Sequence, residues 1–225
     1  MIAAATLRSL EYIKGLYREN LKIDKVFLLD DFGFQPGQRN IDKEGKMAHT
    51  IDEFCKMHGI EFSNFPSDVN SKGLEEVLLV DNASITIYSG YGGQIVKSPI
   101  LNACNQLLHI HSGLLPEYRG STTIYYAILN NDPCGATAIL LDNNIDTGVI
   151  VGERQYKTPE PGADIDFKLD IEFRTDLLID VILNYKNHGD FNSKITQLAD
   201  EGRSYYVAHP VLRHIAILRG GQKKT

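Results

Sequence analysis

Two histidines on one predicted strand are the residues of this chain that first suggest chemistry. Segment 107–111 is a short apolar run that predicts a strand, and alternate residues of a strand lie on one face. His109 and His111 therefore point the same way from the carboxyl end of the strand, beside the loop 112–116. A lone histidine on a strand is more often a core residue. Two together could exchange protons with a substrate or bind a metal ion.

A second candidate is Asp146, in the polar loop 143–148 between two predicted strands. Aspartates in loops rich in Asn and Gly commonly form turns and nothing more. If this loop folds over the histidines, the carboxylate would favour the charged form of an imidazole and fix its orientation. The three side chains would then suit either proton transfer or metal binding, and their spacing does not separate these alternatives.

A third candidate is the glycine-rich segment 89–96, which follows a predicted strand. It fits neither the GxGxxG pattern nor the phosphate-binding P-loop, because it lacks the P-loop lysine. Either it is a flexible turn, or its glycines let the backbone come close to a flat ligand.

The elements that must position these residues alternate along the chain. We predict helices over 6–20, 47–58, 72–80, 122–129 and 165–185, and strands over 25–29, 60–62, 84–88, 107–111, 136–141 and 149–156. This alternation predicts an α/β fold, with a Rossmann-like, mostly parallel sheet and helices on both faces. Residues 1–5 offer only a short first strand, and 32–45 form a loop. In the tail, 205–207 and 215–218 predict small strands or an extension packed on the body.

The composition excludes several classes of function. The chain has 225 residues, a net charge of −6 and no basic run, so bulk charge would not bind nucleic acid or an anionic membrane. No apolar run approaches the ~20 residues of a membrane span, and residues 1–15 lack the signal-peptide pattern. Three widely spaced cysteines predict neither a disulfide framework nor a metal site, and they favour the cytoplasm.

The segments HIHSGLLPEYRG (109–120) and IDTG (145–148) together resemble the folate-dependent formyltransferase family. Within that family the chain is most similar to the amino-sugar N-formyltransferases. The resemblance is strongest over residues 85–156, and it extends to residues 1–84 only in layout. It implies a Rossmann-like catalytic domain over 1–188 and a small C-terminal extension, 189–225, packed on that domain.

Position by position, the resemblance implies that His111 and Asp146 are the catalytic pair and that His109 stands where the family has asparagine. The implied donor is 10-formyltetrahydrofolate. The positions implied to bind it are Gly92, Gly93, Gln94, Ile95, Leu114, Leu115, Pro116, Asp142, Asn143 and Asn144. The acceptor would approach Arg119, Gly120, Ser121 and Thr122. The implied reaction needs no metal, so none is expected.

The acceptor implied by the resemblance is a small-molecule amine, best a nucleotide-linked amino sugar for surface polysaccharide synthesis. Transfer RNA is not expected, because the chain is acidic and only residues 189–225 follow the long helix, fewer than the ~50 of a domain. Segment 2–9 also lacks the glycine-rich phosphate loop of glycinamide ribonucleotide transformylase. A hydrolase that releases formate from the same folate and an inactive folate-binding module remain alternatives. A homodimer is left open.

Overall fold

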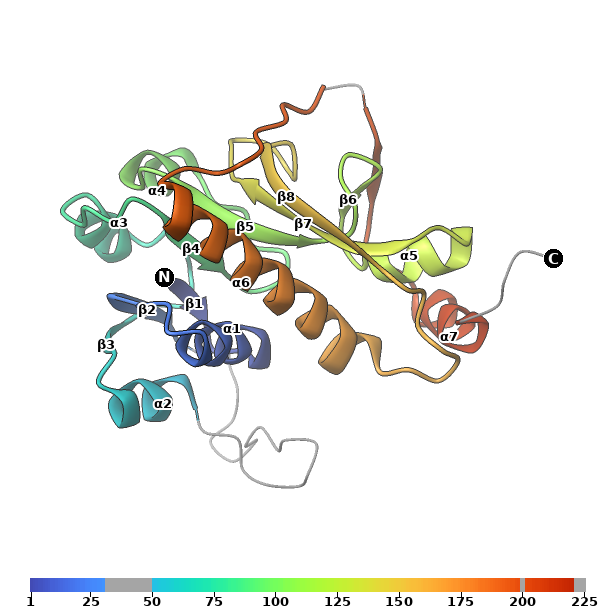
Figure 1. Ribbon diagram of the computed structural model, residues 1–225, viewed down its shortest axis with the longest axis horizontal. Coiled ribbons are helices and arrows are strands. Elements are labelled where there is room, and N and C mark those ends of the chain that lie inside the picture. The colour runs from blue at the N-terminus through green and yellow to red at the C-terminus, as the bar shows by residue number, and fades with distance from the viewer. Residues whose placement is uncertain (31–49, 199–200, 221–225) are drawn as a thin grey trace. The chain divides into compact units, whose positions relative to one another are not determined.

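The computed structural model describes residues 1–30, 50–198 and 201–220, and the chain divides into two compact units, Met1–Leu107 and Leu108–Thr225 (Figure 1). Strands and helices alternate, with a parallel sheet in the first unit and antiparallel strands in the second, so the predicted α/β fold is confirmed. None of the helices in these ranges combines the length and hydropathy needed to cross a membrane. All three cysteines are free thiols.

Four parallel strands, in the order β3-β2-β1-β4, form the sheet of the first unit. Its elements are β1 (Ile2–Ala4), α1 (Leu7–Arg18), β2 (Lys25–Leu29), α2 (Ile51–His58), β3 (Glu61–Phe65), α3 (Lys72–Leu78), β4 (Thr86–Ser89) and α4 (Ser98–Ala103). The first strand is as short as predicted, yet it lies in the middle of this sheet: Ile2 pairs with both Phe27 and Tyr88. All three of its residues are buried, which offsets its lack of length.

The second unit is mainly antiparallel, because β7 pairs antiparallel with both β5 and β8. Its elements are β5 (Leu107–Ser112), β6 (Tyr118–Gly120), α5 (Thr123–Asn130), β7 (Cys134–Leu140), β8 (Val149–Tyr156), α6 (Asp170–His188), β9 (Arg203–Tyr205) and α7 (Pro210–Arg219). Helix α6 packs against β7 and β8, and α7 packs against α5 (Figure 1). The short strands β6 and β9 form a parallel pair of their own.

The predicted elements are confirmed to within a few residues, with two omissions and one error. The bounds of β8 agree with the prediction, whereas α4 and β6 were not predicted. The strand prediction at 215–218 is wrong, because this run lies inside α7. Pro210 starts that helix at its first position and the His209 side chain accepts a hydrogen bond from the Val211 N–H, 3.2 Å away. The predicted loop 32–45 and the first residues of the predicted helix 47–58 lie outside the described residues.

A small apolar cluster fixes the part of the second unit that carries the candidate site. Leu115, Ile139 and Ile150 are buried against one another, and Leu141 packs on them. The cluster fastens the loop after β5 to β7 and β8, and burial of each such side chain contributes roughly 1.5–3 kcal/mol. The loops on either side of the candidate residues are therefore held to a common core.

Candidate active site

The strand β5 presents His109 and His111 on one face, as the sequence predicts. Between them, Ile110 is fully buried on the opposite face. The antiparallel register places His109 opposite Ile139 and His111 opposite Thr137. Arg174 of α6 donates from Nε to the Ile110 carbonyl oxygen, 2.9 Å away, so the backbone between the two histidines is fixed from α6 as well as by β7.

His111 is 3% exposed, and both of its ring nitrogens face acceptors. Its Nε2 donates to the Tyr118 carbonyl oxygen at 2.6 Å, and its Nδ1 lies 3.4 Å from Oδ1 of Asp146. A carbonyl oxygen can only accept, so Nε2 must carry a proton. At Nδ1 the neighbouring group is also an acceptor, the carboxylate of Asp146.

Asp146 is held by its side chain and by its backbone. Its Oδ2 accepts the Gly120 N–H at 2.8 Å, while its carbonyl oxygen accepts from Gln197 Nε2 at 3.1 Å. Its backbone is left-handed, with φ of 54°, a conformation that aspartate tolerates better than most residues. A side chain at Gly148 would collide with the Leu140 carbonyl oxygen, which explains the glycine two residues after Asp146.

The pKa of Asp146 reflects its neighbours more than its burial. Burial raises the pKa of this carboxyl, but the charge and hydrogen bond of His111, the Gly120 N–H and the charge of His109 together lower it well below the ordinary value. The carboxylate is therefore ionised throughout the neutral range.

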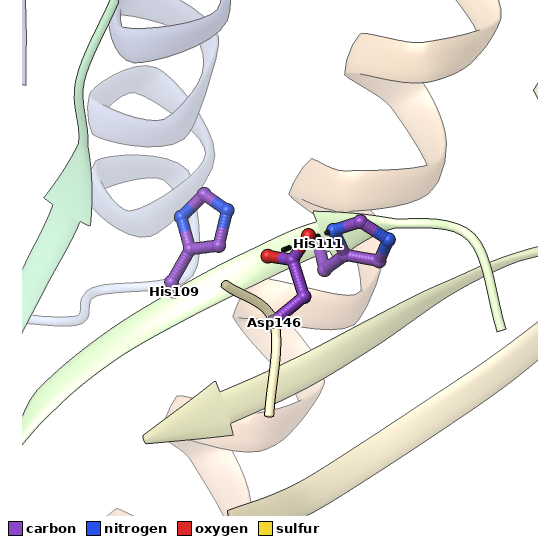
Figure 2. Close-up of side chains that lie close together, drawn as sticks. All are labelled: His109, His111 and Asp146. Carbon is purple, nitrogen blue, oxygen red and sulfur yellow. Dashed lines mark ion pairs between the residues drawn. The ribbon is translucent and has the colours of Figure 1, made fainter. Parts of the chain in front are cut away.

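His109 completes a group of three. One potential ligand atom from each of His109, His111 and Asp146 lies within 4.8 Å of the others. Figure 2 shows both imidazoles rising from β5, with the carboxylate of Asp146 between them in this view. His109 is partly exposed whereas His111 is buried, so substrate has better access to His109. The structure thus brings together the three residues that the sequence selects as catalytic.

The model of the formyl transferase family matches residues 42–159, a little over half of the chain. The chain belongs to the formyl transferase family. Among curated relatives, the methionyl-tRNA formyltransferase of Sulfurovum sp. (strain NBC37-1) is 29% identical over 111 residues, covering 49% of this chain and 36% of that protein. That of Agathobacter rectalis is 31% identical over 131 residues, covering 56% and 42%. The chain thus spans less than half the length of these relatives.

Solved structures place the formyl transferase fold over almost the whole chain. A sugar N-formyltransferase from Shewanella sp. FDAARGOS_354 matches 97% of this chain and 85% of its own, with a TM-score of 0.62 at 18% identity. An N-formyltransferase from Helicobacter canadensis, in complex with folinic acid and dTDP-3-aminofucose, matches 97% and 78%, with a TM-score of 0.61 at 17% identity. At these identities the likeness establishes the fold.

Gln197 belongs to the candidate site in this structure, although the sequence does not indicate it. It is 9% exposed and lies after α6, where Ile195 forms a β-bridge with Ile150. Its Nε2 donates to the carbonyls of Asp146 and Gly148, and its Oε1 accepts from Nε and Nη2 of Arg119 at 3.3 and 3.0 Å. One buried amide thus joins the loop of Asp146 to β6. Nothing in the sequence around it marks a site.

The residues expected to bind the acceptor make hydrogen bonds within the protein in this structure. Arg119 is 6% exposed, and besides Gln197 it donates to the Leu198 carbonyl oxygen. The Gly120 N–H donates to Oδ2 of Asp146, and the Ser121 N–H donates to the Tyr205 carbonyl oxygen at 2.9 Å. Thr122 accepts the Ala208 N–H through Oγ1 at 2.8 Å. Their contact with an acceptor stays a prediction.

The expected folate-binding residues lie in both units. In the second unit, Thr137 shapes the hairpin Leu114–Pro116: its hydroxyl donates to the Gly113 carbonyl oxygen at 2.7 Å and accepts the Leu115 N–H at 3.1 Å. Asp142, Asn143 and Asn144 lie exposed in the loop between β7 and β8, where Asp142 accepts the Asn144 N–H at 3.0 Å.

In the first unit, the glycine-rich segment Gly92, Gly93, Gln94 and Ile95 follows β4. Asn70 fixes its backbone by donating to the Ile95 carbonyl oxygen at 3.0 Å, and Gln94 donates to the Ser67 carbonyl oxygen at 2.7 Å. Gly93 has a φ of 84°, and the space where a Cβ would stand is open at both glycines. The segment is thus an ordered turn with open space above its backbone, and its contact with folate stays a prediction.

Proposed function

We propose that the chain transfers a formyl group from 10-formyltetrahydrofolate to the amine of a nucleotide-linked amino sugar. The observation that carries this proposal is the pair of His111 and Asp146, with the carboxylate ionised and 3.4 Å from the imidazole, in a chain of the formyl transferase family. Formyl transfer to an amine requires a group that stabilises the oxyanion and a group that helps to remove the amine proton, and an imidazole beside a carboxylate supplies both.

In the proposed reaction, the neutral amine attacks the formyl carbon, whose oxygen becomes negatively charged. The new nitrogen–carbon bond forms and the bond from carbon to N10 of the folate breaks. Nε2 of His111 is hydrogen-bonded to the Tyr118 carbonyl oxygen and Nδ1 lies beside Asp146, so in this proposal His111 stabilises the developing oxyanion by the positive charge of its ring. Asp146 helps to remove the amine proton, directly or through water, and that proton is then delivered to N10, so that no proton is gained or lost overall.

His109 has one of two roles in this reaction. As a neutral ring it offers one N–H to the oxyanion, the role that an asparagine amide would fill. Its second nitrogen carries a lone pair that could accept the amine proton, which an amide cannot do. We propose His109 as the third catalytic residue, and the two roles are separable by substitution.

The acceptor class is supported by fold similarity and by charge. Two of the solved structures with this fold are a sugar N-formyltransferase and an N-formyltransferase in complex with dTDP-3-aminofucose. The net charge of −6 disfavours a polyanion such as tRNA. We also retain the cytoplasm as the proposed compartment, because folate and nucleotide sugars are available there and no cysteine is bridged.

Transfer to methionyl-tRNA is the second candidate function, because the curated relatives quoted above are methionyl-tRNA formyltransferases. The two acceptors are separated by incubating the purified chain with 10-formyltetrahydrofolate and either a panel of nucleotide-linked amino sugars or methionyl-tRNA. Mass spectrometry then detects a gain of one formyl group. We expect an amino sugar to be formylated and methionyl-tRNA to stay unchanged. The reverse outcome would make methionyl-tRNA the acceptor.

The same experiment tests the non-transferase alternatives. Formate released from the folate without any amine would indicate a hydrolase. Tight folate binding by calorimetry, with no turnover of any amine or of water, would indicate an inactive binding module. Either result overturns the proposed transfer, and the Asp146→Asn variant serves as the matched inactive control.

A further inference from the structure

The three side chains of the candidate site also have the composition and spacing of a zinc site. Two imidazoles and one carboxylate, with ligand atoms within 4.8 Å of one another, converge from β5 and from the loop between β7 and β8 (Figure 2). Nitrogen and carboxylate ligands of this kind suit Zn²⁺, and three protein ligands are the number that catalytic zinc sites use.

The separation of His111 and Asp146, at the long end for a hydrogen bond, also fits two ligands of a shared metal ion. Their atoms are 3.4 Å apart, beyond the usual 2.7–3.2 Å of an N–H···O bond. Two ligands of a tetrahedral Zn²⁺, each about 2.0–2.1 Å from the ion, lie roughly 3.3 Å from one another. Nδ1 of His111 and Oδ1 of Asp146 therefore already have the spacing of two zinc ligands.

The outer contacts of these two residues are those that metal ligands require. A histidine that binds a metal usually donates its other ring N–H to a carbonyl or carboxylate, and a ligating carboxylate is itself hydrogen-bonded. Nε2 of His111 donates to the Tyr118 carbonyl, and Oδ2 of Asp146 accepts the Gly120 N–H. These contacts occupy Nε2 and Oδ2, and they leave Nδ1 of His111 and Oδ1 of Asp146 as the neighbouring atoms, 3.4 Å apart.

We propose that His109, His111 and Asp146 bind one Zn²⁺ ion, with a fourth position left to water. Zinc binding depends on the histidine at position 109, because the amide oxygen of an asparagine there would be a poor ligand for Zn²⁺ beside imidazole. The inference uses the same side chains as the proposed function but not its chemistry. A metal ion on Nδ1 of His111 takes the place of the ring proton and occupies the carboxylate that the proposed transfer uses, so zinc occupancy and formyl transfer exclude one another.

The test is a titration of the metal-free full chain with Zn²⁺ by calorimetry and with Co²⁺ by visible absorption, without folate or acceptor. We expect one ion per chain, with the ligand-field bands of four-coordinate Co²⁺. His109→Asn and Asp146→Asn should each weaken binding by about 100-fold or more. His188→Asn, at an exposed histidine outside the group, is the matched control and should bind as the unsubstituted chain does.

Circular dichroism of each variant establishes that the fold is retained, and His109→Asn changes only a partly exposed side chain. The inference is overturned if the unsubstituted chain does not bind Zn²⁺, or if His109→Asn binds as tightly as His188→Asn. These outcomes are independent of the proposed function. Zinc binding without formyl transfer would contradict only the proposed function. Formyl transfer without zinc binding would contradict only the proposed metal site.

Discussion

At the scale of single residues, we expect His111 and Asp146 to act as one unit, because they lie 3.4 Å apart and His111 lowers the pKa of the Asp146 carboxyl. We predict that His111→Asn and Asp146→Asn each lower kcat by about 10²–10⁴-fold. The double variant should be little worse than the poorer single variant, because either change already removes the charged pair. Single-turnover kinetics of the three variants measure this directly. A loss of kcat in the double variant equal to the product of the two single losses would show that the two residues act independently.

His109 gives the second prediction at this scale. If His109 is only a donor, His109→Asn keeps most of the activity and the pH–rate profile is unchanged. If it is the base, the rate falls by ~10²-fold or more and the acid limb of the profile moves. Asp146 does not confuse this measurement, because its lowered pKa keeps it ionised well below neutral pH. A fully active His109→Ala would leave His109 without either role.

The sequence predicts the three reactive side chains but not what holds them. The spacing of His109 and His111 on a strand and the Asp-Thr-Gly loop are visible as residue types. The Tyr118 carbonyl and the Gly120 N–H are backbone groups, which every residue has, so no residue type marks their role. Partners of this kind become visible only when the fold brings distant backbone segments together.

At the scale of elements, the segment after α6 positions the loop of Asp146 through Gln197. We predict that Gln197→Glu keeps an oxygen for Arg119 but places a carboxylate against the carbonyls of Asp146 and Gly148. That repulsion should shift the loop and lower kcat by roughly 10-fold or more, with a smaller change in KM. Asn192→Asp makes the same amide-to-acid change at an exposed position of this segment and should have no effect. Equal kinetics for the two variants would remove Gln197 from the site.

The pairing of β6 with β9 depends on Gly120. Its φ is 100°, and a Cβ there would collide with the carbonyl oxygen of Tyr205. We predict that Gly120→Ala lowers the free energy of unfolding by about 2 kcal/mol or more and weakens the bond from the Gly120 N–H to Asp146. Gly162→Ala has a similar positive φ in open space, so chemical denaturation should show a smaller loss there. Similar losses of stability in Gly120→Ala and Gly162→Ala would show that backbone strain at a positive φ explains the whole effect, without the collision with Tyr205.

Element prediction succeeded where residue types favour one element and failed where a single residue decides. Segment 149–156 begins with the β-branched residues Val149–Val151, which favour a strand, and β8 has these bounds. The run 215–218 is wholly apolar, yet Pro210 and the cap at His209 make it part of a helix. The three-residue strand β6 is too short to carry a pattern and exists because β9 pairs with it.

At the scale of the whole molecule, the ion pair of Asp146 links folding to pH. The pKa of Asp146 is lower in the folded chain than the ~3.9 of an unfolded aspartate, so its contribution to stability is complete above pH ~5. It is lost as the pH falls through the folded pKa. We predict that the difference in free energy of unfolding between the unsubstituted chain and Asp146→Asn, on the order of 2 kcal/mol, shrinks below pH ~4.

Urea unfolding at several pH values between 3 and 7 measures this difference. Asp190→Asn is the matched control, because Asp190 pairs with Lys194 at the surface and such a pair contributes little. A difference that grows toward acid pH would contradict the assignment, since it would require the carboxyl to be easier to protonate when folded.

The fold class followed from the alternation of strand and helix patterns, and the family followed from the segments HIHSGLLPEYRG and IDTG. The division at Leu107–Leu108 did not follow, since β5 carries no Pro, Gly or polar linker at that point. A unit boundary that falls at the start of a buried strand leaves no mark in composition. The separate prediction of a boundary near residue 188 remains untested.

The position of that division bears on how such an enzyme diversifies. His109, His111, Asp146 and the groups that brace them, from Tyr118 to Gln197, all belong to the unit Leu108–Thr225. The proposed catalytic centre is therefore one cassette, carried with its supports by a contiguous half of the chain. Changes at the glycine-rich segment 92–95, in the other half, can alter the expected folate contacts without touching that cassette.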